Sequence, residues 1–290
     1  MGIHVPLITP FDADGSVEAV ALERLAHDVL DEGAEGLVAL GTTAEVATLD
    51  EGEKALVRET VGRVCRGRGV RFTVGAGGPD TRRAAEELRA LDADAALVTV
   101  PAFVRPSEDG VVAHFEALAA ASAVPLVVYN IPYRTGRTLS ADTVRRIAAI
   151  PGVSGFKHAV GGIDQDTVLL VREVPLYAGD DVFAPALLAL GAPGAILASA
   201  HLATAQWAEL ARFHDPERGH ALARLAAACF AEPNPTVTKA VLHAQGRIPT
   251  PAVRLPLLPA GRPAVETALR ALAASGDTRD STYALIGETG

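Results

Sequence analysis

The chain has 290 residues, of which 49% are hydrophobic and only 4% aromatic, and its formal net charge is −9. The negative charge argues against general binding of nucleic acids, and the length suits one large α/β domain. Ala- and Leu-rich stretches, such as residues 184–190, are too short and too interrupted to span a membrane. These properties indicate a globular protein whose core is filled mainly by Ala, Val and Leu.

The two cysteines, Cys65 and Cys229, lie far apart and lack companion ligands at the spacing of a metal site. We interpret them as reduced thiols. The N-terminus has no basic segment followed by an apolar one, so we expect no signal peptide. The sequence therefore predicts a cytoplasmic protein.

Eight short apolar runs recur along the chain, and helical periodicity follows them. They are rich in Val, Leu and Ala and do not alternate, which is typical of parallel strands buried on both faces. The runs are 4–9, 35–40, 71–76, 95–100, 125–130, 153–158, 175–180 and 194–199. Helical patterns include 18–32, 50–66, 79–90, 107–122 and 140–149, and four of these begin with expected capping residues, Asp50, Asp80, Ser107 and Ser140.

Eight strand–helix units predict a (β/α)8 barrel over residues 1–213. A doubly wound open sheet is the alternative. Further helical stretches lie near 215–231, 235–245 and 263–275, separated by Pro-rich joints. We predict that residues 214–290 form a C-terminal helical extension packed on the barrel, and that the polar last fifteen residues fray.

Active sites of such barrels lie at the carboxyl ends of the strands. Gly41-Thr42-Thr43-Ala44-Glu45 follows the second run, Tyr129-Asn130 ends the fifth, Lys157 lies in the sixth and Gly179-Asp180-Asp181 ends the seventh. We expect an amine, a phenol and hydroxyls to converge on one rim with the guanidinium of Arg134. No metal or dinucleotide motif is present, so we expect neither a metal nor a cofactor.

Most of these residues also have a purely structural interpretation. Tyr129 could be a core tyrosine, and Arg134 could pair with a structural carboxylate. For Asp180 and Asp181 we favour a helix cap and a solvated charge. His158 follows Lys157 and should point to the opposite side of its strand, so we favour a packing role for it.

Lys157 is the most informative single residue. The chain has only three lysines against 23 arginines. Lys54 and Lys239 lie in charged or polar-flanked helical stretches and are interpreted as ordinary. Lys157 lies in an apolar run, where an ammonium group is costly unless it is paired or works as the neutral amine. It is therefore a candidate for covalent chemistry with a carbonyl substrate.

The motifs together resemble the dihydrodipicolinate synthase / N-acetylneuraminate lyase family of pyruvate-dependent class I aldolases. The similar segments are Leu7-Ile8-Thr9-Pro10-Phe11, Gly41-Thr42-Thr43-Ala44-Glu45, Tyr129-Asn130-Ile131-Pro132, Gly155-Phe156-Lys157, Gly179-Asp180-Asp181 and Asn234-Pro235. They occur in the family's order, and the similarity covers essentially the whole chain. Among the branches, the dihydrodipicolinate synthase branch is the most similar.

The resemblance implies a role for each matching residue. Lys157 would form a Schiff base with the ketone of pyruvate. Thr42 and Thr43 would bind the pyruvate carboxylate, and the Thr43 hydroxyl would also relay protons. Tyr129 would be the proton donor and acceptor near the imine.

Three further implications concern the second substrate, the backbone and the assembly. Arg134 is similar to the residue that binds the carboxylate of the aldehyde partner. Gly179 and Ile196 would supply main-chain contacts around the pyruvyl group. The family resemblance also suggests a homotetramer, with a small-molecule 2-keto acid and an aldehyde as its ligands.

The sequence departs from the family pattern at two places. The synthase branch usually has two tyrosines after the fourth strand, and the second completes a Thr–Tyr–Tyr proton relay in the neighbouring subunit. Here Ala102 and Phe103 stand at these positions. Phe103 keeps the ring and loses the proton, so the relay would be reduced to Thr43 and Tyr129. Ala44 replaces a glycine, and because alanine resists a positive φ we expect this loop to differ slightly.

The leading hypothesis is a Schiff-base lyase that condenses pyruvate with aspartate semialdehyde, since Arg134 is retained. The alternative is an aldolase or dehydratase of a 2-keto-3-deoxy sugar acid or a related 2-keto acid, since Phe103 lacks the hydroxyl. A third hypothesis is a non-catalytic ligand-binding homologue.

Overall fold

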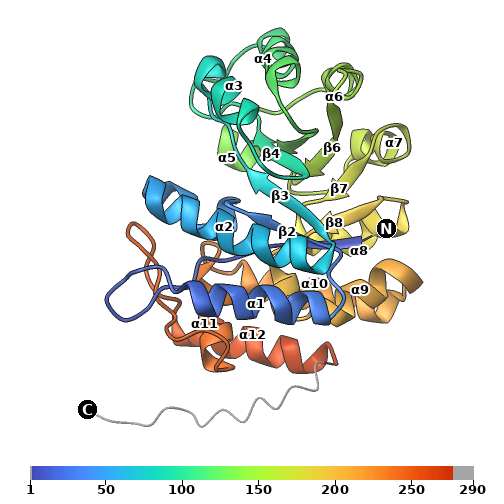
Figure 1. The fold of residues 1–290 in the computed structure, drawn as a ribbon. Helices are drawn as coiled ribbons and strands as arrows, with labels where there is room; N and C mark the ends of the chain where they lie inside the picture. The colour runs from blue at the N-terminus through green and yellow to red at the C-terminus, as the bar shows by residue number, and fades with distance from the viewer. Residues whose placement is uncertain (1, 277–290) are drawn as a thin grey trace.

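A computed structural model describes residues 2–276 as a closed barrel of eight parallel strands (Figure 1). The strands follow the order of the chain, and β8 pairs with β1, which closes the sheet. Their bounds are β1 Gly2–Pro6, β2 Gly36–Ala39, β3 Arg71–Gly75, β4 Ala95–Thr99, β5 Leu126–Asn130, β6 Val153–His158, β7 Leu176–Ala178 and β8 Gly194–Ile196. The predicted (β/α)8 barrel is confirmed. The alternative of an open sheet is wrong, because the sheet is closed and leaves no edge strand.

Helices surround the barrel, as Figure 1 shows. Their bounds are α1 Ala19–Asp31, α2 Glu51–Arg68, α3 Thr81–Arg89, α4 Glu108–Ala121, α5 Pro132–Thr135, α6 Ala141–Ala148, α7 Gln165–Glu173, α8 Ala184–Ala189, α9 Thr204–Phe213, α10 Pro216–Cys229, α11 Thr236–Ala244 and α12 Arg262–Ala274. Short 3₁₀ turns lie at Thr42–Ala44 (η1), Val46–Thr48 (η2), Asp181–Phe183 (η3) and Ser199–His201 (η4).

The helix starts agree with the local chemistry of the sequence. The side chains of Asp50, Asp80, Ser107 and Ser140 each accept a hydrogen bond from a backbone N–H in the first turn of the following helix. At Asp50 the bond is reciprocal, because the Glu53 carboxylate accepts from the Asp50 N–H. The four predicted caps are confirmed, and each satisfies a donor that the helix itself leaves unpaired.

The apolar residues divide into two cores. The larger core lies between the strands and the surrounding helices and includes Phe115, Phe156 and Trp207. The smaller core fills the inside of the barrel with Val38, Ala95, Leu97, Val127, Tyr129, Ile131, Ala159 and Ile196. Tyr129 and Ile196, two of the predicted site residues, therefore lie in the barrel interior.

The C-terminal helices pack against the barrel helices. The α10 helix contacts α8, α9 and α12. The segment after α11 is joined to α1, because Arg24 donates a hydrogen bond to the backbone oxygen of Arg247. The expectation that the last fifteen residues fray concerns residues that, apart from Gly276, lie outside the described part of the chain.

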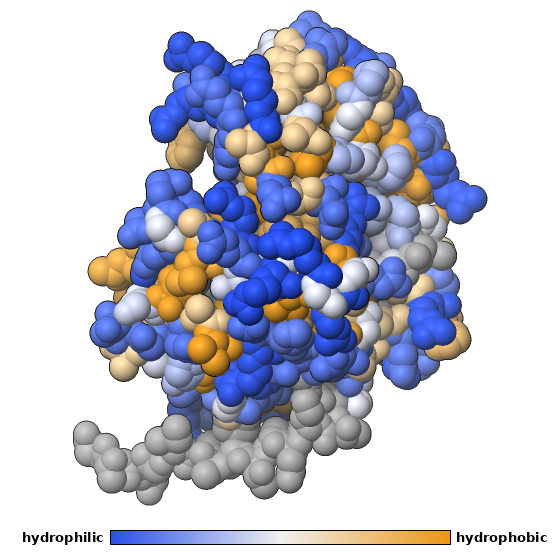
Figure 2. All heavy atoms as spheres, in the orientation of Figure 1, coloured by the Kyte–Doolittle hydropathy of each residue, from blue (hydrophilic) through white to orange (hydrophobic). Residues whose placement is uncertain are grey.

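One face of the molecule is mainly polar. On the face drawn in Figure 2, hydrophilic residues cover most of the area and hydrophobic residues appear in small groups. Within residues 2–276, no helix is both long and apolar enough to cross a membrane.

Candidate active site

The loop after β2 is shaped by two residues in the left-handed region. Leu40 and Glu45 both have φ of 55° and flank the η1 turn that carries Thr42 and Thr43. Gly75 on β3 permits this path, because a Cβ atom there would collide with the backbone oxygen of Leu40. Ala44 lies inside η1 and does not have a positive φ, so replacing glycine there creates no backbone strain.

The two threonines of η1 face different surroundings. Thr42 lines a cavity of about 630 Å³ together with Thr99 and Tyr129. Thr43 is buried, and its hydroxyl oxygen accepts a hydrogen bond of 3.0 Å from the Asn234 side-chain amide. Of the two hydroxyls, that of Thr42 is therefore the one that shares a cavity with Tyr129.

Lys157 and Tyr129 are neighbours across β5 and β6. The two residues are paired in register, and the Lys157 Nζ atom lies 4.5 Å from the centre of the Tyr129 ring. Lys157 is only 6% exposed. Within residues 2–276 its amine has neither an ion-pair partner nor a hydrogen-bond partner. A buried amine that forms no ion pair is a candidate nucleophile.

Gly179 makes room for this lysine. A Cβ atom at residue 179 would lie 2.5 Å from Lys157 Cγ and 3.1 Å from Lys157 Cε. Only a residue without a side chain lets the end of β7 pass so close to the stem of Lys157. The backbone of Gly179 also donates a hydrogen bond to the His158 oxygen at 2.8 Å, which fixes the two strand ends together.

Asp181 is a functional candidate that the sequence reasoning missed. The expectation of a solvated charge is wrong, because the side chain is buried and accepts a hydrogen bond of 2.7 Å from the Ser199 N–H. Burial raises the pKa of Asp181 to about 6, against smaller lowering effects from Ser199 and the charge of Lys157. Burial also raises the pKa of Asp180. A buried carboxyl that senses Lys157 can tune the charge of the site.

Lys239 is not the ordinary helical lysine that the sequence indicated. It is fully buried, and its Nζ atom lies 2.7 Å from Glu45 Oε1. Burial lowers the pKa of Lys239 to about 8, although the charge of Glu45 and the hydrogen bond to it act in the opposite direction. Lys54, by contrast, pairs at the surface with Glu51, as expected. The chain thus has two buried lysines, one paired with a carboxylate and one not.

Arg134 and Phe103 lie outside the buried part of the site. Arg134 is exposed on α5, with its guanidinium 6.0 Å from the centre of the Tyr133 ring. Phe103 is 95% exposed and has φ of 66°. The loop that carries Phe103 is tied to the end of α5, because Arg105 donates a hydrogen bond to the Gly136 oxygen. The predicted convergence therefore holds for the amine and the phenol, while the guanidinium projects into solvent.

His158 points away from this group, as strand alternation predicts. Its Nε2 atom is 3.0 Å from the Thr167 hydroxyl at the start of α7. Burial lowers the pKa of His158 to about 4, so the ring is neutral at neutral pH. This confirms the packing role.

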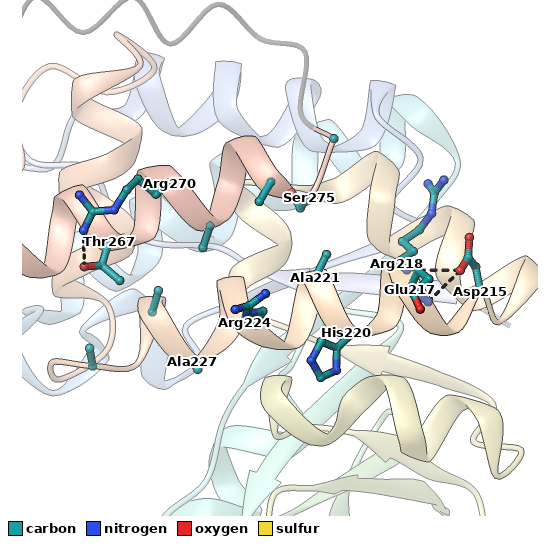
Figure 3. Close-up of a pocket in the computed structure, with 15 residues that line it drawn as sticks. Asp215, Glu217, Arg218, His220, Ala221, Arg224, Ala227, Thr267, Arg270 and Ser275 are labelled. Atoms are coloured by element: carbon teal, nitrogen blue, oxygen red, sulfur yellow. Dashed lines mark hydrogen bonds between the residues drawn. The ribbon is translucent and has the colours of Figure 1, made fainter.

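A second, wider groove of about 980 Å³ lies between α10 and α12 (Figure 3). Arg218, His220 and Arg224 on α10 line it with Thr267 and Arg270 on α12, and the rest is largely alanine. None of the predicted site residues is among its lining residues. Thr42 and Tyr129 line the smaller cavity at the strand ends, and the amine of Lys157 lies against the ring of Tyr129, so the chemistry favours the smaller cavity. Nowhere in residues 2–276 do three or more His, Cys, Asp or Glu side chains form a group that could hold a metal ion.

Comparisons with known proteins show the family of the chain. A model of the dihydrodipicolinate synthetase family matches residues 1–274. The 4-hydroxy-tetrahydrodipicolinate synthase of Moorella thermoacetica is 38% identical over 291 residues, which cover 94% of this chain and 98% of that protein.

Solved structures give the same result. The chloride-inhibited dihydrodipicolinate synthase of Acinetobacter baumannii, solved in complex with pyruvate, matches with a TM-score of 0.88 and 35% identity over 95% of this chain and 98% of that one. A structure described as the first monomeric dihydrodipicolinate synthase variant also has a TM-score of 0.88, with 32% identity over 95% and 96% of the two chains. With a match over nearly its whole length, this chain belongs to the dihydrodipicolinate synthetase family.

Proposed function

We propose that this protein is a lyase that condenses pyruvate with aspartate semialdehyde through a Schiff base on Lys157. The observation that carries the proposal is the state of Lys157: buried, unpaired within the described residues, and 4.5 Å from the centre of the Tyr129 ring. An amine must be neutral to attack a ketone, and a partner carboxylate would oppose this by stabilising the ammonium form.

The reaction uses a protonated imine formed on Lys157 as its electron sink. The Lys157 nitrogen attacks the ketone carbon of pyruvate, and loss of water leaves a protonated imine. The imine withdraws electrons, so the pyruvate methyl group loses a proton and becomes an enamine. The enamine carbon then bonds to the aldehyde carbon while the aldehyde oxygen takes up a proton. This step restores the imine, and water or the amino group of the semialdehyde then adds to the imine carbon and displaces the Lys157 nitrogen. The amine is thereby freed, and no external cofactor is required.

The surrounding residues bind the substrate and move protons. Thr42 and Thr43 bind the pyruvate carboxylate, while the main chain of Gly179 and Ile196 encloses the pyruvyl group. Tyr129 exchanges protons at the imine. For its relay partner the geometry favours Thr42 over Thr43, because Thr42 shares a cavity with Tyr129 and the Thr43 hydroxyl contacts an amide.

The second substrate depends on the exposed residues. A guanidinium at Arg134 binds a carboxylate well, which favours aspartate semialdehyde. The missing hydroxyl at Phe103 favours the other candidate, cleavage or dehydration of a 2-keto-3-deoxy sugar acid or a related 2-keto acid. Rates with aspartate semialdehyde and pyruvate, compared with a panel of such acids, decide between the two.

We also propose that the protein works in the cytoplasm as a homotetramer. The free, buried cysteines suit a reducing compartment. Phe103 and Val104 are exposed on the loop after β4, and Tyr133 is exposed on α5. The Arg105–Gly136 hydrogen bond joins the two segments, and a second subunit that packs here would cover all three side chains. Because one solved relative is described as monomeric, the assembly needs a direct mass measurement.

Trapping the imine tests the central step. Incubation with pyruvate and borohydride should leave a stable adduct on Lys157, located by mass spectrometry of peptides. Lys239 and Lys54 are internal controls, the first buried and paired and the second at the surface. An adduct on either control lysine, or none at all, contradicts the assignment. An adduct on Lys157 in a protein that turns over no 2-keto acid would instead indicate a ligand-binding homologue.

A further inference from the structure

A buried ion pair joins the C-terminal extension to the loop that carries the two threonines. Lys239 on α11 and Glu45 at the end of η1 are 0% and 1% exposed, and their charged atoms are 2.7 Å apart. The Lys239 ammonium also lies 4.0 Å from the centre of the Phe11 ring. The second carboxylate oxygen of Glu45 accepts a hydrogen bond of 2.9 Å from the Arg254 N–H. Both oxygens of Glu45 are thus held by residues beyond the last strand.

Glu45 is the last residue of the Gly41–Glu45 loop, which carries Thr42 and Thr43. Its left-handed backbone ends η1, and its N–H donates a hydrogen bond of 3.1 Å to the Thr42 oxygen. Non-glycine residues adopt this conformation at a cost, so the surrounding structure must enforce it. Asn234 holds the same loop at Thr43, only five residues before Lys239. The extension therefore fixes the loop at two points.

Net stability alone does not account for this pair. Removing two charges from water is expensive, and hydrophobic residues of similar volume often replace a buried ion pair with no loss of stability. A hydrophobic pair, however, would not hold the carboxylate of Glu45 in one orientation. An ammonium and a backbone N–H, each donating to a different oxygen, do so.

We propose that Lys239 is a positioning residue: its ion pair with Glu45 holds the Gly41–Glu45 loop in the geometry that receives the pyruvate carboxylate, and it forms no imine. This inference rests on the proposed function, because it assigns the loop to the carboxylate of the Schiff-base substrate. It also separates the roles of the two buried lysines. Lys157 is the amine to which the proposed function assigns the imine, while Lys239 is an ammonium held by Glu45 and the ring of Phe11.

The test uses the double variant Glu45→Gln/Lys239→Met. Both charges are removed together, so no unpaired charge is left buried, and the amide of Glu45→Gln can still accept from the Arg254 N–H. The single variant Lys239→Met is studied in parallel. It leaves the Glu45 carboxylate buried without its ammonium, so the decision rests on the double variant, which is read out even when the single variant unfolds. Arg262→Met/Glu266→Gln is the matched control, because it also removes both charges of an ion pair, and that pair lies on the surface of α12 and does not line the cavity at the strand ends.

Two measurements are made on the full-length chain. In the first, borohydride trapping on Lys157 is followed against pyruvate concentration. The double variant should need about tenfold more pyruvate for half-saturation, with the trapping rate at saturation little changed, since loss of fixed geometry weakens binding of the carboxylate. In the second, without any ligand, amide hydrogen exchange should accelerate in peptides containing Gly41–Glu45 and not in those of α4 or α6.

The outcomes distinguish this inference from the proposed function. A folded double variant with wild-type half-saturation, or with unchanged exchange in the loop, overturns the positioning role. A trapped adduct on Lys239 of the wild type overturns it as well. If the wild type forms no adduct at all, the proposed function fails, and the exchange measurement alone still decides whether Lys239 holds the loop.

Discussion

Gly179→Ala offers the sharpest test of how the protein places its reactive amine. The added Cβ atom would lie 2.5 Å from Lys157 Cγ, and carbon atoms pack at about 3.5–4.0 Å, so the overlap is about 1 Å or more. The backbone oxygen of His158 lies 3.2 Å from the same position, so the new methyl group is in close contact there as well. Cγ is close to the root of the side chain, so the whole amine must shift.

The expected effects on rate and stability differ. A displacement of about 1 Å can lower a rate by about 100-fold, and we expect a loss of that order in borohydride trapping at saturating pyruvate. Overpacking costs about 1–3 kcal/mol of unfolding free energy, which for a chain of this size lowers the melting temperature by about 2–4 °C per kcal/mol.

The control is Gly162→Ala, in the loop after β6. A Cβ atom there meets nothing within 4 Å, and the residue does not have a positive φ. It should trap pyruvate as fast as the wild type. If the imine on Lys157 of Gly179→Ala is trapped at the wild-type rate, the reasoning is refuted. The Lys157 side chain would then have room that the structure does not provide.

Three further predictions concern titration and the second substrate. Burial raises the pKa of Asp181 from 3.8 to about 6. Below about pH 4 the carboxyl is protonated in both the folded and the unfolded state and the shift does not change the free energy of unfolding, whereas above pH 6 it lowers that free energy by about 3 kcal/mol. Urea unfolding should therefore show Asp181→Asn gaining up to that amount relative to the wild type between pH 4 and pH 7; a difference that is flat with pH would contradict the buried carboxyl. Arg134→Ala should raise KM for aspartate semialdehyde and leave KM for pyruvate and, within about 0.5 kcal/mol, stability unchanged; equal effects on both substrates would remove its assigned role. Phe103→Tyr should increase synthase turnover by restoring a relay hydroxyl, and an unchanged kcat would show that this hydroxyl is dispensable here.

The fold was predictable because its signals are local. All eight apolar runs form strands, and the four capping residues initiate helices as expected. Lys157 could be found because a lysine within an apolar strand is conspicuous by itself. Each of these signals depends on residues close together in the sequence.

Other residues of the site could not be predicted in this way. Lys239 has polar neighbours in the sequence and is nevertheless fully buried, because its partner Glu45 lies 194 residues away. Asp181 looks like a solvated charge, yet it is buried and accepts a hydrogen bond from the Ser199 backbone N–H. Burial of a charged side chain is decided by which distant element supplies the compensating group, and that information is absent from local sequence patterns.

The late position of Asn234, Lys239 and Arg254 in the chain has a consequence for biosynthesis. All eight strands have been translated by Ile196, so a nascent chain can begin to pair them while the ribosome is still adding the extension. Before α11 is synthesised, the Glu45 carboxylate lacks its Lys239 partner, and nothing from the extension holds the Gly41–Glu45 loop in place. A translation product that stops short of residue 234 would therefore contain Lys157 and the Gly41–Glu45 loop, and would lack the three residues that hold this loop in the full chain.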